Sequence, residues 1–200
     1  MSVAESLRIT VADDEPRMRE YLWKSLERLG HVVVSGARTG RELVEQCRQH
    51  QPDLVICDVK MPDMDGIDAA GEIYQFQAVP VILVSAFCDE ELIQRASRNH
   101  ILGYLVKPIK DADLQPAITV AFERFREFET LRGQAADLKQ ALDDRKTIER
   151  AKGILMKRAG LAEPDAFRRL QKLASSKSKK LVEIARMIIT AEEAVETSEP

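Results

Sequence analysis

Short, nearly continuous apolar runs alternate with amphipathic stretches over the first half of the chain. The runs are rich in Val and Ile, as strands buried on both faces are, and they predict strands over Arg8–Ala12, Val32–Ala37, Leu54–Asp58, Val79–Ser85 and Gly103–Val106. The amphipathic stretches predict helices from Pro16 to Gly30, near Gly40–Gln49, Gly66–Gln75 and Glu90–Asn99, and from Asp111 onward. Because parallel neighbours require a helical crossover, this alternation predicts an α/β fold with a doubly wound, five-stranded parallel sheet.

A long helical stretch follows, because the residues from about Leu114 to Ile148 are mostly good helix formers. Gly133 is its weak point. An apolar seam with alternating spacings of three and four residues, typical of a short coiled coil, consists of Phe128, Leu131, Ala135, Leu138 and Leu142. The seam predicts a homodimer. The alternative is that it packs on this chain's own domain.

The rest of the chain predicts a small all-α unit. Stop signals such as Gly160 divide it into three helices, over 146–159, 163–174 and 179–195. We therefore expect three parts: a first domain over residues 1–122, a helical coiled-coil linker over 123–144, and a three-helix domain over 145–200 whose acidic end frays.

The composition is that of a globular protein, with 44% hydrophobic and 32% charged residues. No apolar run approaches the roughly 20 residues that span a bilayer, and Glu5 stands where a signal peptide would need basic residues. We therefore expect a cytoplasmic protein without a membrane partner. The three cysteines include no C-x-x-C pair, which argues against a disulfide framework and against a zinc site.

Charge is distributed unevenly along the chain. Residues 145–190 include 13 basic and 4 acidic residues, a net charge of +9, in a chain whose net charge is −3, so the remainder carries −12. A basic module attached to an acidic one predicts that the basic part binds a polyanion while the acidic part does other work.

Polar residues stand at the carboxyl ends of the predicted strands, where open parallel sheets hold their reactive groups. Asp13 and Asp14 follow the first strand, Asp58 ends the third, Ser85 ends the fourth and Lys107 follows the fifth. Three converging carboxylates would repel one another. A divalent cation with oxygen ligands relieves this repulsion, and Mg²⁺ is favoured because it acts alongside phosphate.

Each of these residues also has a purely structural alternative. Asp13 or Asp14 could cap the following helix, Asp58 could belong to a turn, Ser85 could be a strand-end hydroxyl, and Lys107 could be a solvated surface cation. Five polar groups of suitable chemistry at the same end of their strands argue against this set of alternatives.

Residues 7–122 resemble the receiver domain of two-component response regulators, which has a flavodoxin-like fold. The motifs that carry the resemblance occur in the family's order: A-D-D-E at 12–15, D-V-K-M-P-D-M-D-G at 58–66, V-S-A at 84–86 and Y-L-V-K-P at 104–108. The resemblance implies that Asp58 accepts a phosphoryl group from a phosphohistidine of a sensor histidine kinase. It also implies that Asp14 and Asp58 bind Mg²⁺ directly, Asp13 through water, and Lys60 through its backbone carbonyl.

The other polar residues fit the same chemistry. Phosphoryl transfer needs positioning and charge neutralisation, so Lys107 is the expected second cation, and Ser85 is expected to donate a hydrogen bond to a phosphoryl oxygen. The resemblance implies that Tyr104 is an aromatic switch that turns inward when Ser85 moves toward the phosphate. The alternative role for Tyr104 is core packing. Pro108 is a candidate for a cis peptide bond that aims Lys107.

Residues 145–190 resemble the ANTAR family of RNA-binding antiterminator modules, which follow receiver domains. The resemblance rests on I-E-R-A-K-G-I-L-M at 148–156, A-F-R-R-L at 166–170 and L-V-E-I-A-R-M-I-I at 181–189. It implies binding to paired RNA hairpins and antitermination of transcription. By spacing, Phe167 belongs to the core, and the other expected core residues are Ala151, Gly153, Leu155, Ala166, Leu170, Leu181 and Ala185.

Solvated cations of this module are the expected RNA phosphate contacts: Lys152, Arg169, Lys172, Lys179 and Lys180. The Lys-rich run S-S-K-S-K-K at 175–180 departs from the family's more varied linker, and its alternative role is to keep a loop solvated. Because stacking aromatics are lacking, recognition should depend on phosphate contacts and hairpin shape.

The alternative function is a phosphorylation-controlled DNA-binding transcription factor. The chain has no helix-turn-helix pattern, and its cations are spread over three helices instead of one recognition helix, which argues against this alternative. An enzyme with a substrate of its own has little support, because the reactive constellation is already assigned to phosphoryl acceptance.

Overall fold

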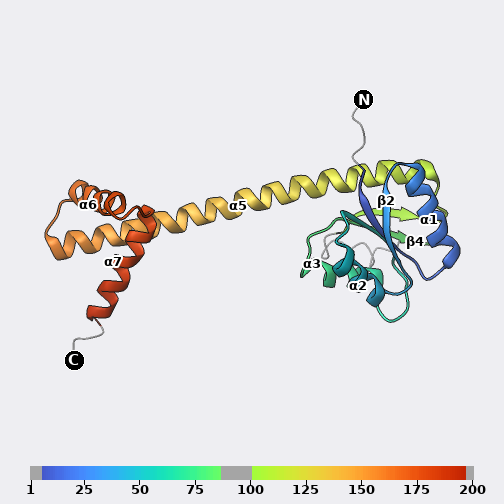
Figure 1. Ribbon diagram of the computed structural model, residues 1–200, viewed down its shortest axis with the longest axis horizontal. Helices are drawn as coiled ribbons and strands as arrows, with labels where there is room; N and C mark the ends of the chain where they lie inside the picture. Colours follow the sequence, from blue (N-terminus) through green and yellow to red (C-terminus); the bar gives the residue numbers. More distant parts are fainter. Residues whose placement is uncertain (1–5, 87–100, 197–200) are drawn as a thin grey trace. The chain divides into compact units, whose positions relative to one another are not determined.

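The computed structural model describes residues 6–86 and 101–196 (Figure 1). The chain divides into two compact units, Met1–Glu129 and Thr130–Pro200. The first contains a five-stranded sheet, and all regular elements described in the second are helices. The predicted helix over Glu90–Asn99 lies outside the described residues.

The strands of the first unit form one parallel sheet with the order β2-β1-β3-β4-β5, so the predicted doubly wound sheet is confirmed. Their bounds are β1 Arg8–Ala12, β2 Val32–Ala37, β3 Leu54–Asp58, β4 Val81–Ser85 and β5 Ile101–Val106. Three strands have the predicted bounds. β5 begins two residues earlier than predicted. β4 begins two residues later than predicted, because the preceding residue, Pro80, has no backbone N–H to donate to the ladder.

Helices cover both faces of this sheet. Helix α1 (Pro16–Arg28) and the first turns of α5 pack on one face, and helices α2 (Gly40–His50) and α3 (Gly66–Tyr74) pack on the other. Alternate residues of β3 enter opposite layers: Ile56 is buried with α1 and α5, and Cys57 with α2 and α3. Burial on both sides explains why the strand segments are apolar at nearly every position.

Helix α5 departs most from the prediction. It runs without interruption from Asp111 to Ala159, over 49 residues and through Gly133. The expected helix over 146–159 is therefore the last part of α5 and not a separate element. Residues 134–152 contain no Gly or Pro that would separate the two predicted helices. Gly133 lowers helix stability by only about 1 kcal/mol, and good helix formers on both sides compensate for it. Gly160 adopts a φ of +63° and ends the helix, as predicted.

The second unit has a small core between the last turns of α5, α6 (Glu163–Ser176) and α7 (Leu181–Glu196). The predicted core residues that are buried or partly buried in the unit are Ala151, Leu155, Ala166, Leu170, Leu181 and Ala185. The assignments of Gly153 and Phe167 to the core were wrong, because Gly153 is exposed and Phe167 keeps 36% of its surface accessible. Gly153 lies two residues from both Ala151 and Leu155, which in a helix is the opposite side.

None of the described helices combines the length and the apolar character that crossing a bilayer requires.

Candidate functional site

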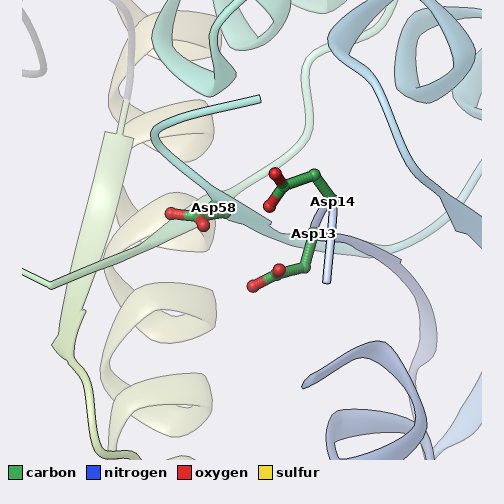
Figure 2. Close-up of side chains that lie close together, drawn as sticks. All are labelled: Asp13, Asp14 and Asp58. Carbon is green, nitrogen blue, oxygen red and sulfur yellow. The ribbon is translucent and has the colours of Figure 1, made fainter. Parts of the chain in front are cut away.

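Three carboxylates converge at the carboxyl edge of the sheet (Figure 2). Asp13 and Asp14 follow β1, and Asp58 is the last residue of β3, which pairs with β1. One oxygen from each carboxylate lies within 4.8 Å of the others. Asp13 is fully buried, Asp58 is 7% exposed and Asp14 is exposed. The cluster can therefore hold a cation that is reached from the side of Asp14.

The loop after β3 holds Asp58 at this edge. Gly66 begins α3 directly against the backbone carbonyl of Asp58, and its N–H donates to the carbonyl of Val59 (2.9 Å). A Cβ at residue 66 would clash with the Asp58 carbonyl, so this close return requires glycine. Asp65 caps the helix by accepting a hydrogen bond from the N–H of Asp68 (2.8 Å). Lys60 is expected to bind the cation through its backbone carbonyl. In this structure its backbone N lies 3.4 Å from Asp58 Oδ1.

Backbone contacts fix the acidic pair after β1. The residue that caps α1 is Glu15, without a side-chain hydrogen bond, so neither aspartate is the helix cap. Asp13 Oδ1 instead accepts a hydrogen bond from the Glu15 N–H (2.9 Å). Arg19 Nη1 donates to the backbone carbonyls of Asp13 (2.6 Å) and Asp14 (3.2 Å). Arg19 was not among the predicted site residues, because its partners are backbone carbonyls, which no side-chain pattern in the sequence indicates.

Lys107 connects two of the carboxylates. Its Nζ lies 2.8 Å from Asp13 Oδ2 and 2.8 Å from Asp58 Oδ2, and its side chain is only 17% exposed. The alternative of a solvated surface cation is therefore wrong, because Lys107 follows β5 and reaches across the edge of the sheet to β3 and β1. The Lys107-Pro108 peptide bond is cis, as anticipated.

Burial and hydrogen bonding have opposite effects on the charges of this contact. Burial raises the pKa of Asp13 above its usual range, although the hydrogen bond from Lys107 opposes this. Burial lowers the pKa of Lys107, but its hydrogen bonds to Asp13 and Asp58 outweigh this effect, so that its pKa lies above the ordinary value. Lys107 is accordingly a fixed positive charge beside Asp58.

Ser85 and Tyr104 lie on the neighbouring strands. Ser85 is the buried last residue of β4, and its carbonyl accepts a hydrogen bond from the Lys107 N–H (2.9 Å). Tyr104 on β5 is partly buried and packs against the layer that contains α2 and α3. Tyr104 therefore contributes to core packing in this structure, which is the alternative role given for it above. Ser85 ends β4, which pairs with the strand of Asp58, and Lys107 follows β5, which pairs with β4.

The candidate RNA contacts of the second unit fall into two groups. Lys152 is only 8% exposed, and its Nζ lies 2.8 Å from both Glu149 Oε2 and Glu163 Oε1 and 5.8 Å from the centre of the Phe167 ring. These hydrogen bonds raise the pKa of Lys152. The expectation that Lys152 stays solvated was wrong, because it joins the end of α5 to the start of α6. The predicted contacts that are exposed are Arg169, Lys172, Lys179 and Lys180.

Other cations of this unit bind carboxylates between helices. Arg150 pairs with Glu193 (2.9 Å) and Arg158 with Glu192 (2.9 Å), which ties α5 to α7. In contrast, Arg169, Lys172, Lys179 and Lys180 form no ion pair within the part of the chain that the structure describes. Among the predicted RNA contacts, the unpaired positive charge therefore lies on α6 and in the connection between α6 and α7.

Comparisons with known proteins identify a family for each of the two units. Residues 9–119 match the response regulator receiver domain family, and residues 136–189 match the ANTAR domain family. The transcriptional regulatory protein PdtaR of Mycobacterium tuberculosis is 42% identical over 182 residues, which are 91% of this chain and 89% of PdtaR. The chemotaxis protein CheY of Bacillus subtilis is 36% identical over 104 residues, 52% of this chain and 87% of CheY.

Solved receiver structures share the fold of the first unit. The crystal structure of the CheX-CheY-BeF3-Mg complex from Borrelia burgdorferi matches with a TM-score of 0.55 and 26% identity, over 57% of this chain and 88% of that chain. The receiver domain of the response regulator NarL from Mycobacterium tuberculosis matches with a TM-score of 0.52 and 28% identity, over 62% of this chain and 95% of that chain. The protein belongs to the response regulators and consists of a receiver domain followed by an ANTAR domain.

Proposed function

We propose that phosphorylation of Asp58 by a sensor histidine kinase controls the binding of RNA hairpins by the ANTAR domain, and thereby antitermination of transcription. The observation that carries this proposal is the position of Asp58, a buried carboxylate between two acidic neighbours and a paired lysine. Phosphorylation would change the charge at one of the two carboxylates that bind Lys107, so the receiver has a defined contact to rearrange.

The chemistry assigned to Asp58 is nucleophilic. A carboxylate oxygen attacks the phosphorus of a phosphohistidine, the P–O bond forms as the P–N bond breaks, and the electron pair and a proton go to the imidazole nitrogen. Lys107 already lies within hydrogen-bond distance of Asp58 and would neutralise an equatorial phosphoryl oxygen. The proposed role of Ser85 is to donate a hydrogen bond to another phosphoryl oxygen, and that of Tyr104 is to turn further inward when Ser85 moves.

The acidic cluster suits Mg²⁺. Oxygen ligands of one Mg²⁺ ion, each at about 2.0–2.1 Å, lie roughly 2.9–4.2 Å apart in an octahedron. One oxygen from each of the three carboxylates lies within 4.8 Å of the others, so small side-chain rotations would suffice to bring two of them onto the ion. Asp14 and Asp58 are the proposed direct ligands, with the carbonyl of Lys60, and Asp13 acts through water. When bound, the ion supplies positive charge that Lys107 alone does not provide for three carboxylates and a phosphoryl group.

The proposed RNA contacts are the exposed cations of α6 and of the α6–α7 connection: Arg169, Lys172, Lys179 and Lys180. Lys152 is no longer among them, because its two carboxylate contacts would have to break before it could bind a phosphate. RNA duplexes are recognised mainly through backbone phosphates and shape, which suits a unit whose one ring, Phe167, lies beneath Lys152.

Dimerisation is the proposed link between the two domains. Four large apolar residues of the predicted seam are 43–65% exposed on α5: Phe128, Leu131, Leu138 and Leu142. Exposed apolar residues at this spacing suit a second copy of the helix better than packing on their own domain. A dimer would present two ANTAR units to two hairpins and raise the apparent affinity through effective concentration.

The experiment uses the full chain, so that phosphorylation of the receiver domain and RNA binding by the ANTAR domain are measured on the same protein. The protein is incubated with a small phosphodonor and Mg²⁺, and its affinity for a paired-hairpin RNA and for duplex DNA of equal length is titrated at several salt concentrations. We expect phosphate incorporation, tighter RNA binding after phosphorylation, and neither effect in Asp58→Asn, whose amide is not a nucleophile. Phosphate uptake by Asp58→Asn at the parent level would refute the assignment of the acceptor. Equal or tighter binding to DNA would favour the DNA-binding alternative.

A further inference from the structure

Gly153 occupies a position in α5 that nothing within its own unit explains. It lies six residues before the end of the helix, is exposed, and an added Cβ would have no atom within 4 Å. Glycine destabilises a helix interior relative to alanine. Gly133, a second helical glycine with no atom within 4 Å of an added Cβ, lies in the linker part of the same helix.

Exposed cations surround this glycine on one side of the helix. Lys146, Arg150, Gly153 and Lys157 follow at spacings of four, three and four residues, which places them on one face about 16 Å long. We call these four residues the glycine face. Ala151 faces the core on the opposite side.

The charge of the glycine face is only partly neutralised. Lys157 has no carboxylate partner among the residues that the structure describes, and Lys146 has only Asp143 at 3.9 Å. Glu149 on the same helix directs its Oε2 to Lys152 Nζ (2.8 Å), and Arg150 binds Glu193 (2.9 Å). The glycine face is therefore cationic, and at Gly153 no side chain projects from the helix.

We infer that the glycine face is a contact surface for the RNA backbone, with the sugar-phosphate chain seated at Gly153 between Lys146 and Lys157. This inference rests on the proposed RNA-binding function and deepens it, because it adds a surface on α5 to the cations of α6 and α7. Close approach of another backbone is a position at which glycine is favoured, and the charge matches a polyanion.

A second copy of this chain is the competing occupant, because the glycine face continues along α5 from the apolar seam. Two such faces opposed across a twofold axis would bring like cations together, which is unfavourable. An RNA strand, in contrast, is attracted by both copies.

The test uses substitutions that should stabilise helix α5 and at the same time weaken RNA binding. Gly153→Ala and Gly153→Gln in the full chain both raise helix propensity, so both should raise the melting midpoint of the ANTAR unit. Affinity for a paired-hairpin RNA should fall by about threefold for Ala and by about tenfold for Gln, the latter equivalent to about 1.4 kcal/mol. Gly133→Gln is the matched control and should raise the midpoint without changing RNA affinity.

The outcomes separate this inference from the proposed function. RNA affinity of Gly153→Gln equal to that of the parent would overturn the inference and leave the proposed function intact. Failure of the parent to bind RNA would overturn both. Sedimentation supplies the remaining control: a lower dimer fraction in Gly153→Gln, with unchanged RNA affinity per monomer, would assign the face to a second copy of the chain and overturn the RNA assignment.

Discussion

Lys107→Met isolates the electrostatic role of the lysine that joins two buried carboxylates. Methionine preserves the apolar stem and removes the charge, which leaves Asp13, fully buried, facing Asp58, which is 7% exposed. Removal of one partner from a buried ion pair costs about 3–5 kcal/mol. Because Lys107 keeps 17% of its side chain exposed and water screens part of the effect, we expect about 3 kcal/mol in the absence of divalent cations. For a domain of this size, this loss lowers the melting midpoint by roughly 10 °C.

Mg²⁺ should restore much of this stability. An ion that binds the folded state stabilises it in proportion to the logarithm of its concentration above Kd, and without Lys107 it no longer shares the carboxylates with a lysine. The shift of the midpoint between EDTA and millimolar Mg²⁺ should therefore be larger in Lys107→Met than in the parent.

The measurement is thermal unfolding followed by circular dichroism, with and without Mg²⁺. Lys24→Met is the matched control, because Lys24 binds Glu20 at 2.6 Å but is 62% exposed. Such a surface pair contributes at most about 1 kcal/mol. If Lys107→Met in EDTA melts no lower than Lys24→Met, the contact with Asp13 and Asp58 does not stabilise the receiver and the reasoning fails.

Three further predictions concern other parts of the molecule. Leu138→Lys places a charge in the exposed seam of α5 and should leave a monomer with and without phosphodonor; an unaltered dimer in sedimentation would move the interface to the receiver. Burial lowers the pKa of His31, whose Nδ1 accepts a hydrogen bond from the Leu7 N–H (3.2 Å), so the unfolded chain binds the proton more strongly and stability should decline as pH falls below about 6.5. His31→Asn, which keeps an acceptor, should flatten this decline in melts between pH 7.5 and 5.5, and an equally steep decline would exclude His31 as its cause. Lys179→Ala should reduce the slope of log affinity for RNA against log salt by somewhat under about one unit, whereas Lys152→Met should leave the slope unchanged; the reverse result would restore Lys152 as the phosphate contact.

The sheet and the acidic site could be predicted because each depends on local pattern and one topological rule. Strands buried on both faces require continuous apolar runs, and β3 shows this directly, with Ile56 and Cys57 in opposite layers. Once the strands are known, their carboxyl ends meet at one edge, so Asp13 and Asp58 had to be neighbours.

The pairing of cations could not be predicted in the same way. Lys152 finds one partner, Glu149, on its own helix and the other, Glu163, on α6, and the second contact depends on how the turn after Gly160 folds. Arg19 acts through backbone carbonyls, which have no sequence signature. The continuity of α5 was missed for a different reason: residues 134–152 contain no Gly or Pro that would end a helix, so the linker helix and the helix predicted over 146–159 form one element.

The same local arrangement, a buried lysine between two carboxylates, has opposite consequences in the two units. Lys107 binds Asp58, the proposed phosphoacceptor, so that a change in the charge of its partner would displace it. Lys152 binds Glu149 and Glu163, which lie outside any cluster of metal-binding groups in the described part of the chain, so we expect its contacts to be independent of Mg²⁺ and to connect α6 to α5. Lys152→Met should therefore lower the melting midpoint of the ANTAR unit equally in EDTA and in Mg²⁺, whereas the effect of Lys107→Met depends on the ion. If Mg²⁺ rescued both variants or neither, the distinction between a switchable and a structural lysine would be wrong.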